Sequence, residues 1–250
     1  MTWEKDFIHA IDPDAFAAAV GLELDDWQSR LLDSTSRKVI MLCSRQAGKS
    51  TTAALLALHS AVFDPGLVIL VSPSQRQSSE LFRKVLDHMR ALDEPPEISM
   101  ESITRLELRN GSRIVSLPGS EVSVRGYSAA KLVVVDEASR VPDSLMAAVR
   151  PMLAVGNGRL IALSTPAGKR GWFHSAWTDG DGWERYKVAA KDIPRITPEF
   201  LADELKELGP DMYSQEYELA FVDDDSQIFS TELIDAMLSR QDILPLWTST

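Results

Sequence analysis

The segment from Lys38 to Ser50 constrains the fold of this chain more than any other part of the sequence. From Lys38 to Cys43 it is apolar almost without interruption, as expected for a strand that is buried on both faces of a sheet. A Gly-Lys-Ser sequence follows at residues 48–50 and opens a helical pattern. A strand covered on both faces requires helices on both sides, so we predict an α/β fold with a mostly parallel central sheet.

The loop between this strand and the helix has the composition of a phosphate-binding loop. Backbone N–H groups in such a loop surround phosphate oxygens, and the helix N-terminus adds the positive end of its dipole. Gly48 allows close approach of the backbone, Lys49 reaches the β- and γ-phosphates, and Ser50 coordinates Mg²⁺. The usual pattern has another glycine at position 43, where this chain has Cys43. Taken alone, Gly-Lys-Ser could also be an ordinary helix start.

A second half of the expected site lies further along the chain. The apolar run Leu132 to Val135 predicts another buried strand, and it ends in Asp136 and Glu137. An aspartate there can hold the water shell of Mg²⁺, and the adjacent glutamate can polarise a water for in-line attack on phosphorus. Acids at strand ends also occur as helix caps, but two half-sites in the correct order favour nucleotide hydrolysis.

Two further pairs of residues are candidates with plain alternatives. Ser164 and Thr165 close the next predicted strand, where hydroxyl groups can sense loss of the γ-phosphate. Ser-Thr-Pro is equally good turn chemistry. Trp27 and Gln28 precede the phosphate loop, and an indole with an amide can bind adenine. Trp27 could instead be an ordinary core residue.

Composition excludes several other classes of protein. The apolar runs are too short to span a bilayer, so no membrane association is expected. Cys43 is the only cysteine, which excludes an internal disulfide, and the four histidines lie apart from other metal ligands, which argues against a zinc site. The formal net charge of −11 argues against a protein that coats nucleic acid with its whole surface.

Strand and helix patterns alternate over the first 165 residues, and Asn110-Gly111 predicts a hairpin. After that point, helical patterns that begin at Pro198 and Pro210 predict a small lid. The acidic run Asp223–Asp225 favours a linker. The predicted parts are an N-terminal helical segment (1–36), a P-loop ATPase core (37–165), a helical lid (166–222) and a linker or tail (223–250).

Taken together, these motifs resemble the ATPase domain of the large terminase subunit of tailed bacteriophages, the motor that packages viral DNA into preformed capsids. The resemblance covers nearly the whole chain. Its most specific segments are Ser44-Arg45-Gln46-Ala47-Gly48-Lys49-Ser50, Val124-Arg125-Gly126-Tyr127, Val135-Asp136-Glu137-Ala138 and Ser164-Thr165-Pro166. That family tolerates a missing first glycine, which accounts for Cys43. The resemblance implies a RecA-like P-loop NTPase of the ASCE group with a small C-terminal helical lid.

The resemblance also implies roles for individual residues. The expected ATP-binding residues are Trp27, Gln28, Ser44, Arg45, Gln46, Ala47, Gly48, Lys49, Ser50 and Thr51. The expected catalytic residues are Glu137, Lys49, Arg45 and, supplied by a neighbouring subunit, Arg125. Ser50 and Asp136 would hold Mg²⁺, and Ser164 and Thr165 would couple hydrolysis to motion. Arg125 could instead be a surface arginine paired with Glu121.

The partners implied by the resemblance are a homo-oligomeric ring, expected to be a pentamer, double-stranded DNA, the portal protein and the small terminase. The isolated domain is expected to be monomeric. The expected location is the cytoplasm of the infected bacterial host, with transient docking on the viral procapsid. Family members usually carry a nuclease domain, and this chain stops near where that domain would begin. We therefore expect ATP hydrolysis and DNA translocation, but no DNA cleavage by this chain.

The main alternative is a superfamily 2-like nucleic-acid helicase or remodelling ATPase, because Asp136-Glu137-Ala138 followed by serine is similar to the helicase acid box. Such enzymes usually need a second RecA-like half, and no second strand-helix series follows residue 166. A nucleotide-binding module without hydrolysis would not need Glu137. For DNA, Arg105, Arg109 and Arg113 could grip phosphates in a pore, or they could be solvated residues of a hairpin.

Overall fold

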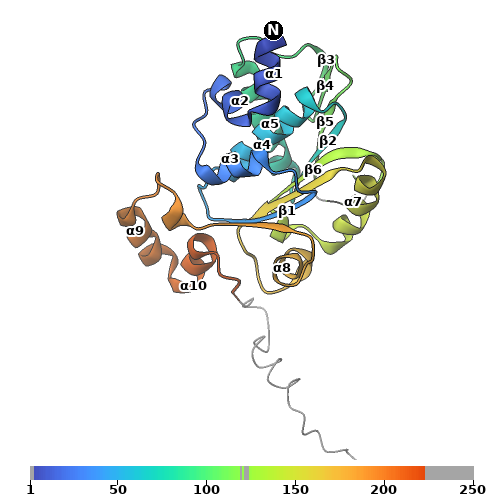
Figure 1. Cartoon of the computed structure of the whole chain (residues 1–250). Coiled ribbons are helices and arrows are strands. Elements are labelled where there is room, and N and C mark those ends of the chain that lie inside the picture. Colours follow the sequence, from blue (N-terminus) through green and yellow to red (C-terminus); the bar gives the residue numbers. More distant parts are fainter. Residues whose placement is uncertain (1–2, 119, 121–123, 223–250) are drawn as a thin grey trace, which may run out of the picture.

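An eight-stranded sheet lies at the centre of the computed structural model, which describes residues 3–118, 120 and 124–222 (Figure 1). Its strands are β1 (Lys38–Cys43), β2 (Leu67–Ser72), β3 (Ile98–Glu101), β4 (Arg105–Leu108), β5 (Arg113–Pro118), β6 (Ala130–Asp136), β7 (Arg159–Ser164) and β8 (Glu184–Val188). Their order is β3-β4-β5-β2-β6-β7-β1-β8. From β5 to β8 in this order neighbouring strands are parallel, whereas β3, β4 and β5 pair antiparallel. The predicted α/β fold is confirmed.

Helices cover both faces of this sheet (Figure 1). They are α1 (Trp3–Ile11), α2 (Pro13–Ala19), α3 (Asp26–Asp33), α4 (Lys49–Phe63), α5 (Gln75–Ala91), α7 (Asp143–Gly156), α8 (Gly171–Thr178), α9 (Pro198–Leu208) and α10 (Pro210–Tyr213). Short helical turns occupy Ala138–Arg140, Ala190–Asp192 and Ser214–Glu218.

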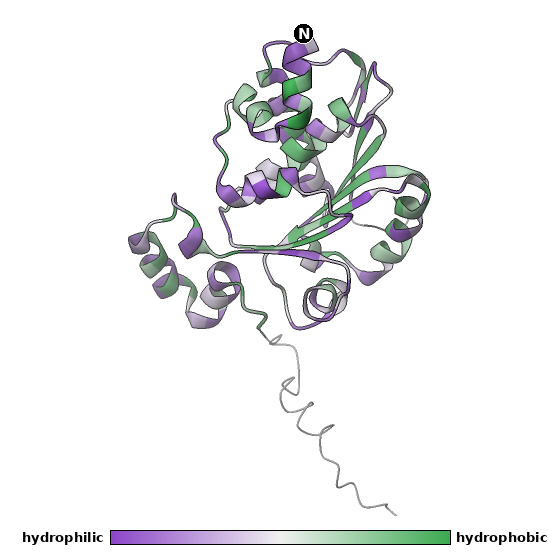
Figure 2. Ribbon diagram, viewed as in Figure 1, coloured by the Kyte–Doolittle hydropathy of each residue, from purple (hydrophilic) through white to green (hydrophobic). Residues whose placement is uncertain are grey.

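Strand β1 shows why the sheet needs both helical layers. Val39 and Met41 join a core that includes residues of α2 to α5, whereas Ile40 and Leu42 join a second core with α7 and α8. Successive side chains of a strand point to opposite faces, so both faces of β1 are buried. Figure 2 shows that the central strands are mostly hydrophobic, whereas the helices around them carry a mixture of hydrophobic and hydrophilic residues.

The strand predicted from Lys38 to Cys43 is β1, the run Leu132 to Val135 lies within β6, and the helices predicted to begin at Pro198 and Pro210 are α9 and α10. The hairpin at Asn110-Gly111 forms between β4 and β5, and Gly111 has φ 90°, a left-handed conformation that glycine adopts readily. Strand β3 was not predicted. Its four residues alternate apolar and polar, but the run is short and all four are exposed, so it lacks the continuous apolar run that identified the buried strands.

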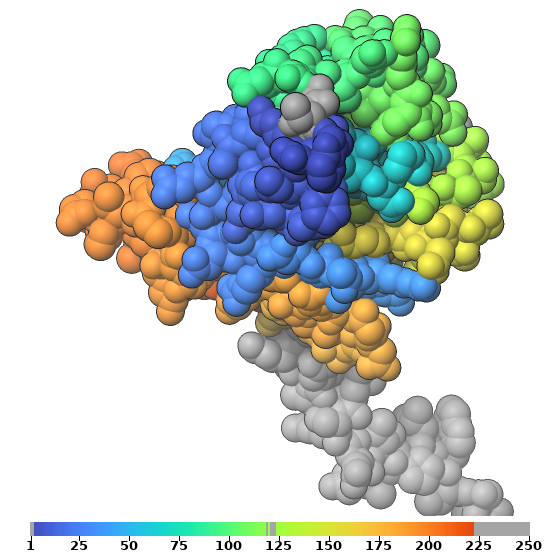
Figure 3. All heavy atoms as spheres, turned by 45° about the horizontal axis from the view of Figure 1, so that its top comes forward, coloured from blue at the N-terminus to red at the C-terminus, as the bar shows by residue number. Residues whose placement is uncertain are grey.

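The prediction of a purely helical lid over residues 166–222 was wrong for part of this range. Glu184–Val188 forms β8, which pairs in parallel with β1 and extends the central sheet. The signal was weak because this edge strand is short, charged and only partly buried. The helical part is α9, α10 and the turn Ser214–Glu218, and α9 lies in a lobe at the side of the sheet (Figures 1 and 3).

Helices α1 to α3 lie within the predicted N-terminal helical segment. The acidic run Asp223–Asp225 and the rest of the predicted tail lie outside the described residues. Within the described residues, no helix is both long and apolar enough to cross a membrane.

Candidate nucleotide site

The phosphate loop occupies residues 44–48, between the end of β1 and the start of α4. Gln46 and Gly48 have positive φ angles of 60° and 88°, which curl the backbone back on itself. At the start of the loop, the Ser44 N–H donates to the Val188 carbonyl at 2.9 Å, so β8 anchors it. Gly48 is the N-cap of α4, and in the described part of the chain no side chain caps this helix start. A curled backbone before an uncapped helix N-terminus directs backbone N–H groups toward one point, which suits phosphate oxygens.

Cys43, at the position of the usual first glycine, lies within β1 and not in the loop. Its side chain is fully buried, and burial raises the pKa of its thiol to about 12. The curvature begins after Cys43, so this position does not need the conformational freedom of glycine.

The two halves of the predicted site meet at the ends of β1 and β6. The Ser50 hydroxyl donates to Asp136 Oδ2 at 2.8 Å, and Lys49 Nζ lies 3.2 Å from Glu137 Oε1. Asp136 is 6% exposed. Burial, and after it the neighbouring Glu137 carboxylate, raise the pKa of Asp136, while Lys49 and the Ser50 hydroxyl lower it. The four residues converge from segments that are distant in the sequence.

Ser50 and Asp136 fit a magnesium ion. They offer two hard oxygen donors side by side, and a divalent cation would offset the cost of burying the Asp136 carboxylate. Mg²⁺ in phosphate-transfer sites is usually held by one or two protein oxygens together with substrate phosphates and water. The described residues contain no group of three or more His, Cys, Asp or Glu side chains that could hold a metal ion.

Glu137 is held from two sides. Its backbone is left-handed, with φ 50°, and its second carboxylate oxygen Oε2 lies 2.8 Å from Arg140 Nη1. Arg140 also donates to Thr165 Oγ1 at 3.1 Å and pairs with Glu216 at 3.3 Å. Sequence reasoning missed Arg140 and Glu216. The spacing of three residues between Glu137 and Arg140 was the available signal for one of them.

Ser164 and Thr165 are buried at the end of β7, directly beside the turn that follows Glu137. The hydroxyls of Ser139 and Ser164 lie 2.7 Å apart, and the Ser139 hydroxyl donates to the Thr165 carbonyl at 2.8 Å. The Ser139 and Ser164 side chains therefore join the turn after β6 to the end of β7.

Gln28 is buried, and both ends of its amide have protein partners. Its Oε1 accepts from the Asp25 N–H at 2.8 Å, and its Nε2 donates to Thr52 Oγ1 at 2.6 Å. The amide thus links the start of α3 to the first turn of α4 through hydrogen bonds. Trp27 is mostly buried and lines a cavity of about 520 Å³ together with Asp25, Lys187, Asp192 and Pro194.

The remaining predicted residues are more exposed. Arg45 Nε lies 3.4 Å from Glu216 Oε2, and Arg125 is exposed in the turn before β6. Arg105 pairs with Glu107, and Arg109 lies 3.0 Å from Glu97. Arg113 is exposed and stands opposite Glu107 in the sheet register. Acids therefore lie near the three arginines suggested for DNA binding, and their contact with DNA stays a prediction.

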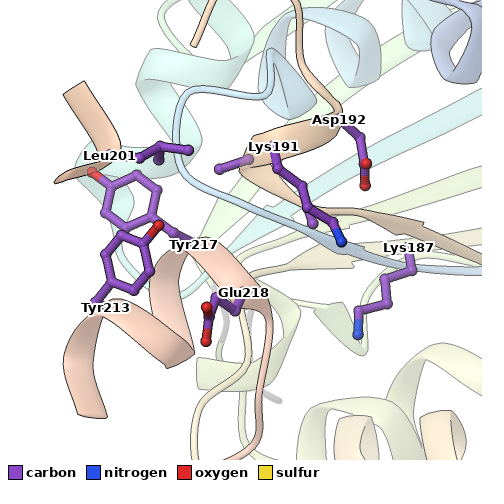
Figure 4. A pocket seen from close by; sticks show the side chains of 9 residues that line it. Lys187, Lys191, Asp192, Leu201, Tyr213, Tyr217 and Glu218 are labelled. Carbon is purple, nitrogen blue, oxygen red and sulfur yellow. The ribbon is translucent and has the colours of Figure 1, made fainter. Parts of the chain in front are cut away.

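A second cavity, of about 440 Å³, lies between β8 and the lid helices and shares Lys187 and Asp192 with the cavity beside Trp27 (Figure 4). Tyr213 and Tyr217 stack on one side of it, with ring centroids 5.3 Å apart, and Lys187 and Lys191 lie on another. Asp192 and Glu218 also line it, so its charges balance. None of the predicted site residues lines this cavity.

The parallel sheet, the curled loop before α4 and the paired acids at the end of β6 define a P-loop NTPase. Among such proteins, one family accounts for most of the chain: the sequence model of "Terminase large subunit, T4likevirus-type, N-terminal" matches residues 40–236. The chain belongs to this family, which confirms the resemblance seen in the motifs and does not favour the helicase alternative.

Individual relatives agree with this assignment. The chain is 25% identical over 255 residues to a terminase large subunit of Thermus phage G20c, covering 87% of this chain and 52% of the relative. It is 24% identical over 212 residues to that of Escherichia phage T5, covering 80% and 48%. The chain thus spans about half the length of the curated relatives it matches.

Solved structures share the fold. The large terminase ATPase domain of Thermus phage P74-26 has a TM-score of 0.73 and 21% identity, covering 84% of this chain and 98% of that domain. The large terminase of bacteriophage HK97 has a TM-score of 0.65 and 16% identity, covering 79% of this chain and 50% of that one.

Proposed function

We propose that this domain hydrolyses ATP to ADP and phosphate with Mg²⁺ as cofactor. The observation that carries the proposal is the convergence of Ser50 with Asp136 and of Lys49 with Glu137 at the mouth of the phosphate loop. This is the set of groups that phosphoryl transfer needs: a phosphate cradle, a metal position, a cation and a base. A solved large terminase of bacteriophage D6E is in complex with ADP, and another crystal of it with ATP-γ-S, which supports nucleotide as the ligand.

In the proposed reaction the loop N–H groups and Lys49 bind the β- and γ-phosphates. Mg²⁺, held by Ser50 and Asp136, would neutralise charge on the phosphate oxygens. Glu137 accepts a proton from the water as its oxygen attacks the γ-phosphorus, and ADP departs from the opposite side. Arg45 from within the loop neutralises charge on the transferred phosphoryl group. Ser164 and Thr165 respond to loss of the γ-phosphate.

We further propose that the domain drives double-stranded DNA into a viral procapsid as part of a homo-oligomeric ring. Family membership supports this proposal. In it, Arg125 enters the site of a neighbouring subunit, consistent with its exposed position before β6. The proposed partners are the portal protein and the small terminase. The proposed location is the cytoplasm of the infected bacterial host, with transient docking on the procapsid. Residues 166–222 supply the proposed lid.

Phosphate release measured against protein concentration tests the proposed ATPase activity and the proposed ring with Arg125 acting in a neighbouring subunit. Wild type is compared with Glu137→Ala and Arg125→Ala, then with a mixture of the two, and Arg83→Ala, an exposed arginine on α5, is the control. Turnover that rises with concentration, two inactive variants and recovery in the mixture are expected, because a mixed interface pairs an intact Glu137 with an intact Arg125. Wild-type phosphate release no greater than that of Glu137→Ala would remove the ATPase proposal. Flat turnover with an active Arg125→Ala would leave a monomeric P-loop enzyme.

A further inference from the structure

Arg140 lies outside the two predicted half-sites, yet it contacts three parts of the structure. It ends the short helical turn after Glu137, and its guanidinium meets Glu137, Thr165 and Glu216. We propose that Arg140 is the positioning residue of Glu137: it holds the carboxylate while Lys49 binds nucleotide, and it ties that carboxylate to β7 and to the lid. This inference rests on the proposed ATPase function.

The first step of the argument concerns the partners of Glu137. One carboxylate oxygen lies 3.2 Å from Lys49 Nζ and the other 2.8 Å from Arg140 Nη1. When Lys49 binds the β- and γ-phosphates, we expect its three N–H donors to turn toward the phosphate oxygens, which weakens its contact with Glu137. When the lysine turns to the nucleotide, Arg140 remains as the cation that orients Glu137. A base within reach of its water loses much of its effect if it is misplaced by about 1 Å.

The second step concerns what holds Arg140. Thr165 is 2% exposed and the Glu216 side chain 7% exposed, so two buried groups fix the guanidinium. The Arg140 N–H also donates to the Glu137 carbonyl at 2.9 Å, which closes the turn between them. The planar fork of arginine suits such a three-way contact better than a single ammonium.

The third step concerns the lid. The Glu216 carbonyl accepts from the Arg45 N–H at 3.2 Å, and its carboxylate lies between Arg45 and Arg140. The turn Ser214–Glu218 is thus attached to the phosphate loop through Arg45, and to the turn after β6 through Arg140. Glu216 also pairs with Arg45 and Glu137 with Lys49, so neither carboxylate loses every cation when Arg140 is replaced, and the main expected consequence is positional.

The test compares wild type with Arg140→Gln and Arg140→Lys. The control is Arg83→Gln, because Arg83 also pairs with a glutamate three residues away, Glu80 at 3.0 Å, on an exposed part of α5. Three quantities are measured: kcat and KM for ATP, the Kd of a fluorescent ADP analogue, and nucleotide-free hydrogen–deuterium exchange of peptides covering 137–141 and 214–219.

We expect Arg140→Gln to lower kcat on the order of 10- to 100-fold, with KM and Kd changed by less than about threefold. Arg140→Lys should recover part of kcat, because an ammonium can still contact Glu137. Exchange in both peptides should rise in Arg140→Gln, and Arg83→Gln should match wild type in every measurement. A kcat for Arg140→Gln within twofold of wild type overturns the proposal, as does a fall in nucleotide affinity as large as the fall in kcat.

The exchange measurement separates this inference from the proposed function. If wild type releases no phosphate, the ATPase proposal fails, and exchange alone then decides whether Arg140 links the two segments. Faster exchange in both peptides of Arg140→Gln supports the link without catalysis. Unchanged exchange overturns it whatever the activity.

Discussion

Replacing Gln28 with alanine separates a structural role of this residue from a role in reading adenine. The buried amide makes two hydrogen bonds, one to the Asp25 N–H at 2.8 Å and one to Thr52 Oγ1 at 2.6 Å. At about 1 kcal/mol for each bond, Gln28→Ala should lower the free energy of unfolding by roughly 2 kcal/mol. For a chain of this size that corresponds to a fall in Tm of roughly 4–8 °C.

Urea and thermal unfolding without nucleotide measure this loss. Gln77→Ala is the matched control, because Gln77 occupies the same third position of α5 but is exposed. A double-mutant cycle with Thr52→Val should return a coupling of about 1 kcal/mol, since it removes the partner of the Gln28 Nε2 bond.

The preference of the Gln28→Ala variant for adenine over guanine nucleotides distinguishes the structural role from a role in reading adenine. If Gln28 braces α4, Gln28→Ala should weaken binding of ATP and GTP analogues by similar factors, because the whole helix start loosens. The reasoning is refuted if nucleotide-free stability changes by less than about 0.5 kcal/mol while the preference for adenine is lost. In that case the amide would leave its protein partners to contact the base.

Two more predictions follow from the loop. Gly48→Ala should weaken binding of a fluorescent ADP analogue at least about tenfold and lower the free energy of unfolding by roughly 1–2 kcal/mol. The reason is that the φ angle of Gly48 is 88° and an added Cβ would lie 3.1 Å from Gln28 Nε2. Unchanged affinity would contradict the assigned loop geometry. Cys43 should resist alkylation by iodoacetamide at pH 8 in the folded protein and react after unfolding, because burial raises its pKa to about 12 and keeps the thiol protonated and inaccessible. Mass spectrometry measures the fraction of alkylated Cys43. Rapid labelling of the native protein would contradict the position of Cys43 inside β1.

The strands and helices that carry the candidate site could be predicted because their signals are local. Strand β1 and helix α4 begin where the sequence indicated, since continuous apolar residues identify a strand buried on both faces. The Asp136-Glu137 pair could be placed at a strand end for the same reason. Parallel strands bring their carboxyl ends to one edge, so the two half-sites could be expected to meet.

Other features carry no local signal. Strand β8 is charged and partly exposed, and only its pairing with β1 makes it a strand. The role of Gln28 depends on Thr52, which lies 24 residues away, and the two partners of Glu216 approach it from the phosphate loop and from the turn after β6.

The sequence by itself determined the buried central strands and the phosphate loop, because apolar runs and loop motifs are properties of neighbouring residues. The same motifs pointed to the family. Only the tertiary structure decided which charged groups become partners. Arg140 and Glu216 lie 76 residues apart and meet at 3.3 Å. Attraction between charges depends on distance through space and on burial, and neither is written in the order of residues along the chain.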